Sequence, residues 1–174
     1  DLAVCGPLAR SPADLRLALS IMAGPAQRHA KGWQLSLKPA VKQQLSDYKV
    51  VIWATDATAP VADEVSTRAL EVGAQLEASG ASVSYTARPQ FDVVAAHENY
   101  QTLLNSAMTS GMGPEEVARM QRRADSLATD DRSRGAQITR AAVLSHRDWI
   151  RANGQREKIR AAWDEFFEAW DIVV

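Results

Sequence analysis

The stretch YKVVIWA, from Tyr48 to Ala54, determines how the rest of the chain is interpreted. Its β-branched and aromatic residues predict a strand over about 48–54. The apolar residues follow one another almost without interruption instead of alternating with polar ones. This pattern predicts that the strand is buried on both faces, as in a parallel sheet.

A helix and a second strand are predicted directly after this strand. Gly80 is suited to end the helix, because glycine is common just past a helix C-terminus, and residues 82–87 read as the second strand. A strand, a helix and a strand at this spacing form a βαβ unit with parallel strands and a right-handed crossover. The predicted fold class is therefore α/β. The helix, over residues 61–79, shows the spacing of one buried face at Val65, Ala69, Val72 and Leu76.

The remainder of the chain is predicted to be mostly helical. Helix-starting and helix-ending signals recur through a helix-rich segment over residues 91–170, with Asn153-Gly154 as a predicted interruption of its last helix. Residues 171–174 read as a terminal strand. An earlier helix begins at Ser11-Pro12, where a capping serine precedes a proline at the first helical position. We expect residues 1–174 to form a single domain.

Composition and charge exclude several classes of protein. Apolar residues make up 46% and charged residues 24% of the chain, which is typical of a globular protein. The formal net charge is −1, and the basic residues are interspersed with acidic ones, so a nucleic-acid-binding surface is not predicted. No apolar run is long enough to cross a membrane. A single cysteine, Cys5, fits a reducing compartment and is predicted to be buried, and we expect a cytoplasmic protein.

Neither a cofactor site nor a metal site is predicted. The turn after Trp53 lacks the glycines that let a pyrophosphate approach the backbone, and Asp56 in that turn would repel phosphate. The three histidines, His29, His97 and His146, do not show metal-ligand spacing.

Other chemically suggestive groups have simpler structural interpretations. His97 and Glu98 are adjacent, and adjacent residues of a helix do not face each other. Glu115 and Glu116 complement the dipole at a helix N-terminus. The mixed charges over residues 119–134 indicate a solvated face. We interpret the helically spaced aromatic residues as core packing, at Trp163, Phe166 and Trp170.

Several motifs of this chain resemble the amidase-signature family in their sequence and in their order. GPLARSPADL at residues 6–15 is similar to a stretch that follows the catalytic signature of that family. The strand at 50–54, PVADEV at 60–65, GA-x-V at 80–83 and ARP-x-FD at 87–92 continue the resemblance. SHRDW at 145–149 and the segment from 166 to 174 extend it across nearly the whole chain. The resemblance implies a partial amidase-signature fold.

The resemblance also implies a chemistry whose residues this chain does not contain. Amidase-signature enzymes hydrolyse small-molecule amides with a Ser nucleophile, a bridging Ser in a cis peptide and a Lys, all located before the region that this chain resembles. The sequence contains no Gly/Ser-rich run, and none of its lysines lies in a matching motif. We therefore assign no catalytic residue here and expect a scaffold and substrate-side part of an amidase, inactive alone.

Two alternatives to this interpretation remain. The chain could be a non-catalytic binding module with a βαβ shell, or part of a glutamyl-tRNA amidotransferase subunit, although residues 145–149 are less similar to that branch. Because the sequence runs from Asp1 to an apolar end at Val174, we expect both ends to be cut points in a longer protein, the alternative being a processed chain with a terminal edge strand. Uncovered strand edges would then favour a homo-oligomer or reorganised helices.

Overall fold

The computed structural model describes residues 4–56 and 58–174 and divides the chain into two compact units, Asp1–Val41 and Lys42–Val174. The first unit contains helix α1 (Pro12–Met22). As predicted, Ser11 begins this helix: its side-chain oxygen accepts a hydrogen bond from the Asp14 N–H at 3.1 Å. The expectation of a single domain over residues 1–174 stays a prediction.

The prediction that Cys5 is buried is wrong, because its side chain is exposed. This cysteine lies in residues 4–9, which form neither a helix nor a strand. Helix α1 likewise has no buried residue. Its apolar side chains are exposed, at Leu15, Leu17, Leu19, Ile21 and Met22.

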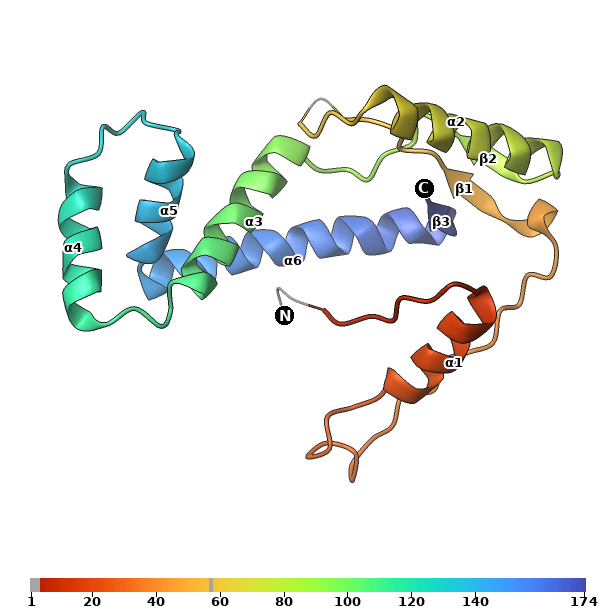
Figure 1. Ribbon diagram of the computed structural model, residues 1–174, viewed down its shortest axis with the longest axis horizontal. Coiled ribbons are helices and arrows are strands. Elements are labelled where there is room, and N and C mark those ends of the chain that lie inside the picture. Colours follow the sequence, from red (N-terminus) through yellow and green to blue (C-terminus); the bar gives the residue numbers. More distant parts are fainter. Residues whose placement is uncertain (1–3, 57) are drawn as a thin grey trace. The chain divides into compact units, whose positions relative to one another are not determined.

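The second unit is built on a parallel sheet whose strand order is β2-β1-β3 (Figure 1). Val50 of β1 (Lys49–Val51) lies opposite Val83 of β2 (Ser82–Ser84) and Ile172 of β3 (Ile172–Val173). Val50, Val51 and Ile52 are at most 1% exposed. The predicted α/β class, the parallel strands and the burial of the central strand are therefore confirmed.

The strands are shorter than the predicted ranges 48–54, 82–87 and 171–174. The ladder continues only slightly past β1: the Ile52 N–H donates to the Ser84 carbonyl at 2.9 Å and the Trp53 N–H to the Val174 carbonyl at 2.7 Å. Beyond this point β2 turns away, because the Ser84 hydroxyl accepts hydrogen bonds from the N–H groups of Thr86 and Ala87. The hydrogen bonds to the Ser84 hydroxyl thus end β2 earlier than the predicted residue 87.

Helix α2 (Asp63–Ala78) connects β1 to β2, as predicted. Gly80 ends it with a φ of 88°, in the region where an L side chain is strained. The Ala81 N–H then donates to the Leu76 carbonyl at 3.0 Å, which satisfies one of the free carbonyls at the helix end. Of the predicted buried face, Ala69, Val72 and Leu76 are half-buried, whereas Val65 is exposed.

Gly73 of α2 lies close to the residues that follow β1 and β2. A Cβ at this position would lie 2.8 Å from Ile52 Cγ1 and 2.8 Å from the Tyr85 hydroxyl oxygen. Both distances are shorter than any ordinary carbon contact, so only glycine lets the helix backbone approach this closely. The sheet and α2 therefore pack through a position without a side chain.

The helix-rich segment predicted over residues 91–170 contains four helices, with α6 extending from the other three to the sheet (Figure 1). The first begins at Val93 and not at Phe91, because the Asp92 carboxylate accepts a hydrogen bond from the Ala95 N–H at 3.0 Å and caps it. Their buried core comprises Leu103, Ala136, Thr139 and Ala141. The helices are α3 (Val93–Met108), α4 (Pro114–Asp125), α5 (Arg134–Ala142) and α6 (His146–Ala169).

The predicted interruption at Asn153-Gly154 is wrong, because α6 continues without a break through both residues. A single glycine costs a helix only about 1 kcal/mol relative to alanine. Packing of α3 and α6 offsets this cost, and the Asn99 side-chain amide donates to the Ala152 carbonyl at 3.0 Å. Tertiary contacts thus override a local signal.

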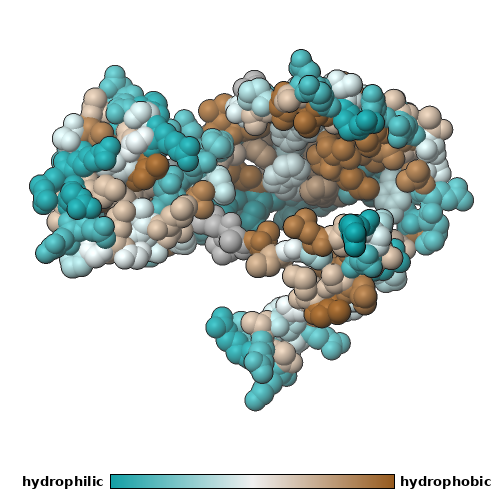
Figure 2. Space-filling model, in the orientation of Figure 1, coloured by the Kyte–Doolittle hydropathy of each residue, from teal (hydrophilic) through white to brown (hydrophobic). Residues whose placement is uncertain are grey.

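Apolar side chains remain on the surface of several elements, as the brown areas of Figure 2 show. In the second unit they include residues on and just before α2, and others at the end of α6 and on β3. No helix in the described part of the chain is both long and apolar enough to span a membrane. The exposed set includes Val61, Val65, Leu70, Phe167 and Ile172.

Replacement of Gly73 by alanine should test the close packing of α2. We expect Gly73→Ala to lower the free energy of unfolding by about 1–3 kcal/mol, because the added methyl group forces Ile52 and Tyr85 to move. Gly154→Ala is the matched control: no atom lies within 4 Å of its Cβ position, so it should stabilise α6 by about 0.5–1 kcal/mol. Urea unfolding of the three proteins measures both changes, and equal changes in the two variants would contradict this packing.

Candidate functional site

The carboxyl edge of the sheet is the expected position of a ligand site in this fold class. In open α/β sheets, ligands bind in crevices outside the carboxyl ends of the strands. Residues 53–56 leave β1 at this edge, and residues 85–88 leave β2 beside them. The side chains of these two segments therefore meet although they are distant in the sequence.

Arg88 and Trp53 form the central contact of this edge. The Arg88 guanidinium carbon lies 4.6 Å from the centroid of the Trp53 ring, within the range of a cation–π interaction. Arg88 also donates to the carbonyl of Ala87 at 2.7 Å and to that of Tyr85 at 3.4 Å. The guanidinium is thus held in place by an aromatic face and by backbone acceptors.

Asp56 lies in the turn after Trp53 and is ionised. Its Oδ1 atom accepts hydrogen bonds from the Thr58 N–H at 2.8 Å and from the Thr58 hydroxyl at 2.6 Å. The side-chain hydrogen bond from Thr58 lowers the pKa of Asp56 most, followed by the backbone hydrogen bond, with smaller contributions from Trp53 and from the charge of Arg88. A carboxylate with a lowered pKa is a weak base, so this pair holds the turn and does not activate the hydroxyl.

An aromatic cluster continues from Trp53 to the end of α6. The centroid of Trp163 lies 6.3 Å from that of Trp53, 5.9 Å from Phe91 and 5.5 Å from Phe166. Phe166 is buried, as predicted, whereas Trp163 and Trp170 are half-buried. The predicted core role is therefore confirmed for Phe166, and Trp163 also lines the edge of the sheet through its contact with Trp53.

A cleft of about 350 Å³ opens at this edge. Its lining is apolar except for the threonines and the Asp56 carboxylate, and it includes Trp53, Val61 and Val93. Mostly apolar walls with a few polar groups are what small organic ligands require. The arrangement can bind and orient such a ligand.

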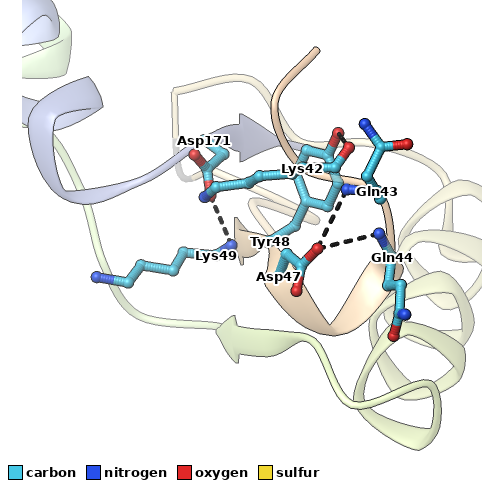
Figure 3. Close-up of polar contacts among 7 residues, drawn as sticks. All are labelled: Lys42, Gln43, Gln44, Asp47, Tyr48, Lys49 and Asp171. Carbon is cyan, nitrogen blue, oxygen red and sulfur yellow. Dashed lines mark hydrogen bonds and ion pairs between the residues drawn. The ribbon is translucent and has the colours of Figure 1, made fainter.

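A polar cluster, shown in Figure 3, lies at the opposite, amino edge of the sheet. Asp171 accepts a hydrogen bond from the Lys49 N–H at 2.8 Å and donates its own N–H to the Lys49 carbonyl at 2.9 Å. Its carboxylate also forms an ion pair with Lys42. Asp47 accepts two backbone hydrogen bonds at 3.1 Å, from Gln43 and Gln44. This cluster ties the start of β3 to the start of β1 and has a structural role.

Comparison with known families identifies the chain. The family model described as Amidase matches residues 1–174. The chain belongs to the amidase family. The match agrees with the resemblance noted in the order of the sequence motifs. Neither the curated proteins nor the solved structures gave a match to this chain.

The three histidines considered in the sequence lie at separate places in the fold. His29 stacks on Trp33 with centroids 6.5 Å apart. His97 is on α3, and His146 is the first residue of α6. Within residues 4–56 and 58–174, no group of three or more His, Cys, Asp or Glu side chains could hold a metal ion.

The acidic start of α4 and the mixed charges that follow it are arranged as predicted. Glu116 accepts a hydrogen bond from the Gly113 N–H at 3.3 Å and so caps the helix, beside Glu115 in the first turn. Most charged residues over 119–134 are exposed, but Asp131 is half-buried. The Arg140 guanidinium donates to the Asp131 carbonyl at 2.6 Å and therefore fixes the loop before α5.

The sequence analysis does not predict the stacking of Arg88 on Trp53. It places Trp53 in a strand and Arg88 only in a family motif. The two positions could have indicated the contact, because each residue follows a parallel strand of the same βαβ unit. Residues that follow neighbouring parallel strands meet at one edge.

Replacement of Asp171 should show that the amino-edge cluster stabilises this chain in a pH-dependent way. The side-chain hydrogen bond from Lys42, and then the Lys49 N–H, lower the pKa of Asp171 in the folded chain. The stabilisation is therefore present above the unfolded carboxyl pKa of about 3.9 and is lost as the pH falls through the lower folded value. We expect Asp171→Asn to cost about 1 kcal/mol at pH 7 and clearly less at strongly acidic pH.

Urea unfolding of wild type and Asp171→Asn across the acidic and neutral range measures this difference. Asp164→Asn is the control, because Asp164 is exposed on α6 and is outside the cluster. A cost of Asp171→Asn that does not change with pH would refute the ionic contribution.

Proposed function

We propose that this chain provides the scaffold and a substrate-side wall of an amidase that hydrolyses the C–N bond of carboxylic amides. The Ser nucleophile, the bridging Ser and the Lys lie outside these 174 residues. Membership of the amidase family supports the reaction class. The absence of a Gly/Ser-rich run from the sequence supports the location of the catalytic residues.

The stacking of Arg88 on Trp53, a residue that lines the carboxyl-edge cleft, carries this proposal. A guanidinium group has five N–H donors in a fixed plane, and the carbonyls of Ala87 and Tyr85 accept from only one of its nitrogens. The remaining donors suit a carbonyl oxygen, which every carboxylic amide has. Trp53 and Val93 supply apolar surface for the rest of the substrate.

The requirements of amide hydrolysis explain why this chain is proposed to bind the substrate while other residues hydrolyse it. A serine hydroxyl is a weak nucleophile and needs a neighbouring base. Backbone N–H groups must also stabilise the oxyanion that forms on the carbonyl. At the carboxyl edge, the described residues provide neither an activated hydroxyl nor such a base, since the Thr58 hydroxyl donates to an ionised Asp56. The chain can therefore orient an amide, and the hydrolytic step requires the other residues.

The first test is an activity assay of the 174-residue chain. We expect no release of ammonia from a panel of aliphatic and aromatic primary amides beyond that of a protein-free blank. A complete amidase assayed in parallel is the positive control. Sustained turnover by this chain, abolished by heat denaturation, would show that its own residues perform the chemistry.

The second test places Arg88→Met in the longer enzyme encoded by the complete reading frame. If Arg88 binds the amide equally in the ground and transition states, KM should rise about tenfold while kcat changes little. Arg68→Met, on the exposed surface of α2, is the control and should leave both constants unchanged. An unchanged KM in Arg88→Met would remove Arg88 from the substrate wall.

A further inference from the structure

A larger cleft, of about 520 Å³, lies between α3 and α6. It has no lining residue in common with the carboxyl-edge cleft. Phe91 and Asp92 line the α3/α6 cleft, whereas Val93 lines the carboxyl-edge cleft. Its volume is within the range of about 300–1,000 Å³ that small-ligand sites occupy.

Small residues on α3 account for the hollow. Ala95 and Ala96 occupy the first turns of this helix, where larger side chains would fill the space against α6. Phe91 and Ile159 complete an apolar lining. This lining favours a ligand with an apolar body.

Three charged side chains line the cleft: Asp92, which caps α3, Glu98 of α3 and Lys158 of α6. Among the described residues, the side chains of Glu98 and Lys158 have neither an ion pair nor a hydrogen bond. Two other polar groups of the lining already have partners. Asp92 caps α3, and the side-chain amide of Asn99 donates to the Ala152 carbonyl.

The pair of charges restricts the chemistry of a ligand. An anion attracted by Lys158 would be repelled by Glu98, and a cation attracted by Glu98 would be repelled by Lys158. Arg132 and Arg140 share a neighbouring hollow with Glu98, but Arg140 is bound to the carbonyls of Asp131 and Ala128. Only a ligand with both charges satisfies both walls of the α3/α6 cleft.

We propose that the α3/α6 cleft binds a zwitterionic short peptide of about dipeptide size with an apolar side chain. The ammonium group lies at Glu98, the carboxylate at Lys158, and the side chain contacts Phe91 and Ile159. This inference goes beyond the proposed function, because binding here involves no hydrolytic step and no contact with Arg88. Failure of this binding would leave the proposal for amide hydrolysis intact.

Calorimetric titration of the 174-residue chain with the dipeptide alanyl-phenylalanine tests the inference. We expect saturable binding in the millimolar range. Acetylation of the amino terminus should weaken it about three- to tenfold, and amidation of the carboxyl terminus should weaken it similarly, since each removes one charge-assisted contact at a partly exposed site. Absence of saturable binding, or equal affinity for all three peptides, would overturn the proposal.

Variants assign each charge to its wall. Glu98→Gln should weaken the free dipeptide as much as acetylation does, and should have no further effect on the acetylated peptide, because the two changes remove the same contact. Lys158→Gln should weaken binding of the free dipeptide as much as amidation does, and should have no further effect on the amidated peptide. Glu168→Gln, an exposed change on α6 outside the cleft, should bind all three peptides as wild type does.

Additive losses from Glu98→Gln and acetylation would mean that the ammonium binds elsewhere and would overturn the assignment. If a variant does not fold, the comparison of the three peptides on the wild-type chain still decides whether both ligand charges are recognised.

Discussion

The second unit depends on the backbone hydrogen bonds of β1 to two parallel neighbours. An isolated buried strand would leave N–H and C=O groups without partners in a place that water does not reach. β2 satisfies one side of β1 through a short connection that contains α2. β3 satisfies the other side from the far end of the chain. The approach of α2 at Gly73 and the contact of the aromatic cluster with Trp53 form around this paired central strand.

The pairing of β1 with β3 is a long-range contact, since Asp171 lies 122 positions after Lys49. Closing such a loop costs conformational entropy, although the cost grows only slowly with length. The helical segment between β2 and β3 folds on its own core and brings α6 back to the sheet. The aromatic cluster at the end of α6 and the hydrogen bonds of Asp171 then fix β3 in register with β1.

The βαβ unit was predictable from the sequence because its signals are local. The continuous apolar residues predict β1, the helical period predicts α2, and Gly80 marks the end of α2. Each of these signals acts on the residues next to it. The exact strand ends were not predictable, because the Ser84 hydroxyl stops β2 through its own backbone contacts. The continuity of α6 through Gly154 depends on α3, and the stacking of Arg88 on Trp53 depends on the sheet. Local propensity carries no information about such partners. Family membership was predictable from the order of motifs, whereas the two clefts depend on side chains that the fold brings together from distant segments.

The late position of β3 in the chain has a consequence for synthesis on the ribosome. β1, α2 and β2 emerge first and can pair at once, because their contacts are close in sequence. One edge of β1 then lacks its partner while the whole helical segment is translated. An unpaired edge next to buried valines is a template for pairing with another nascent chain. Chaperone demand should therefore be concentrated in the interval between the emergence of Val51 and that of Val173.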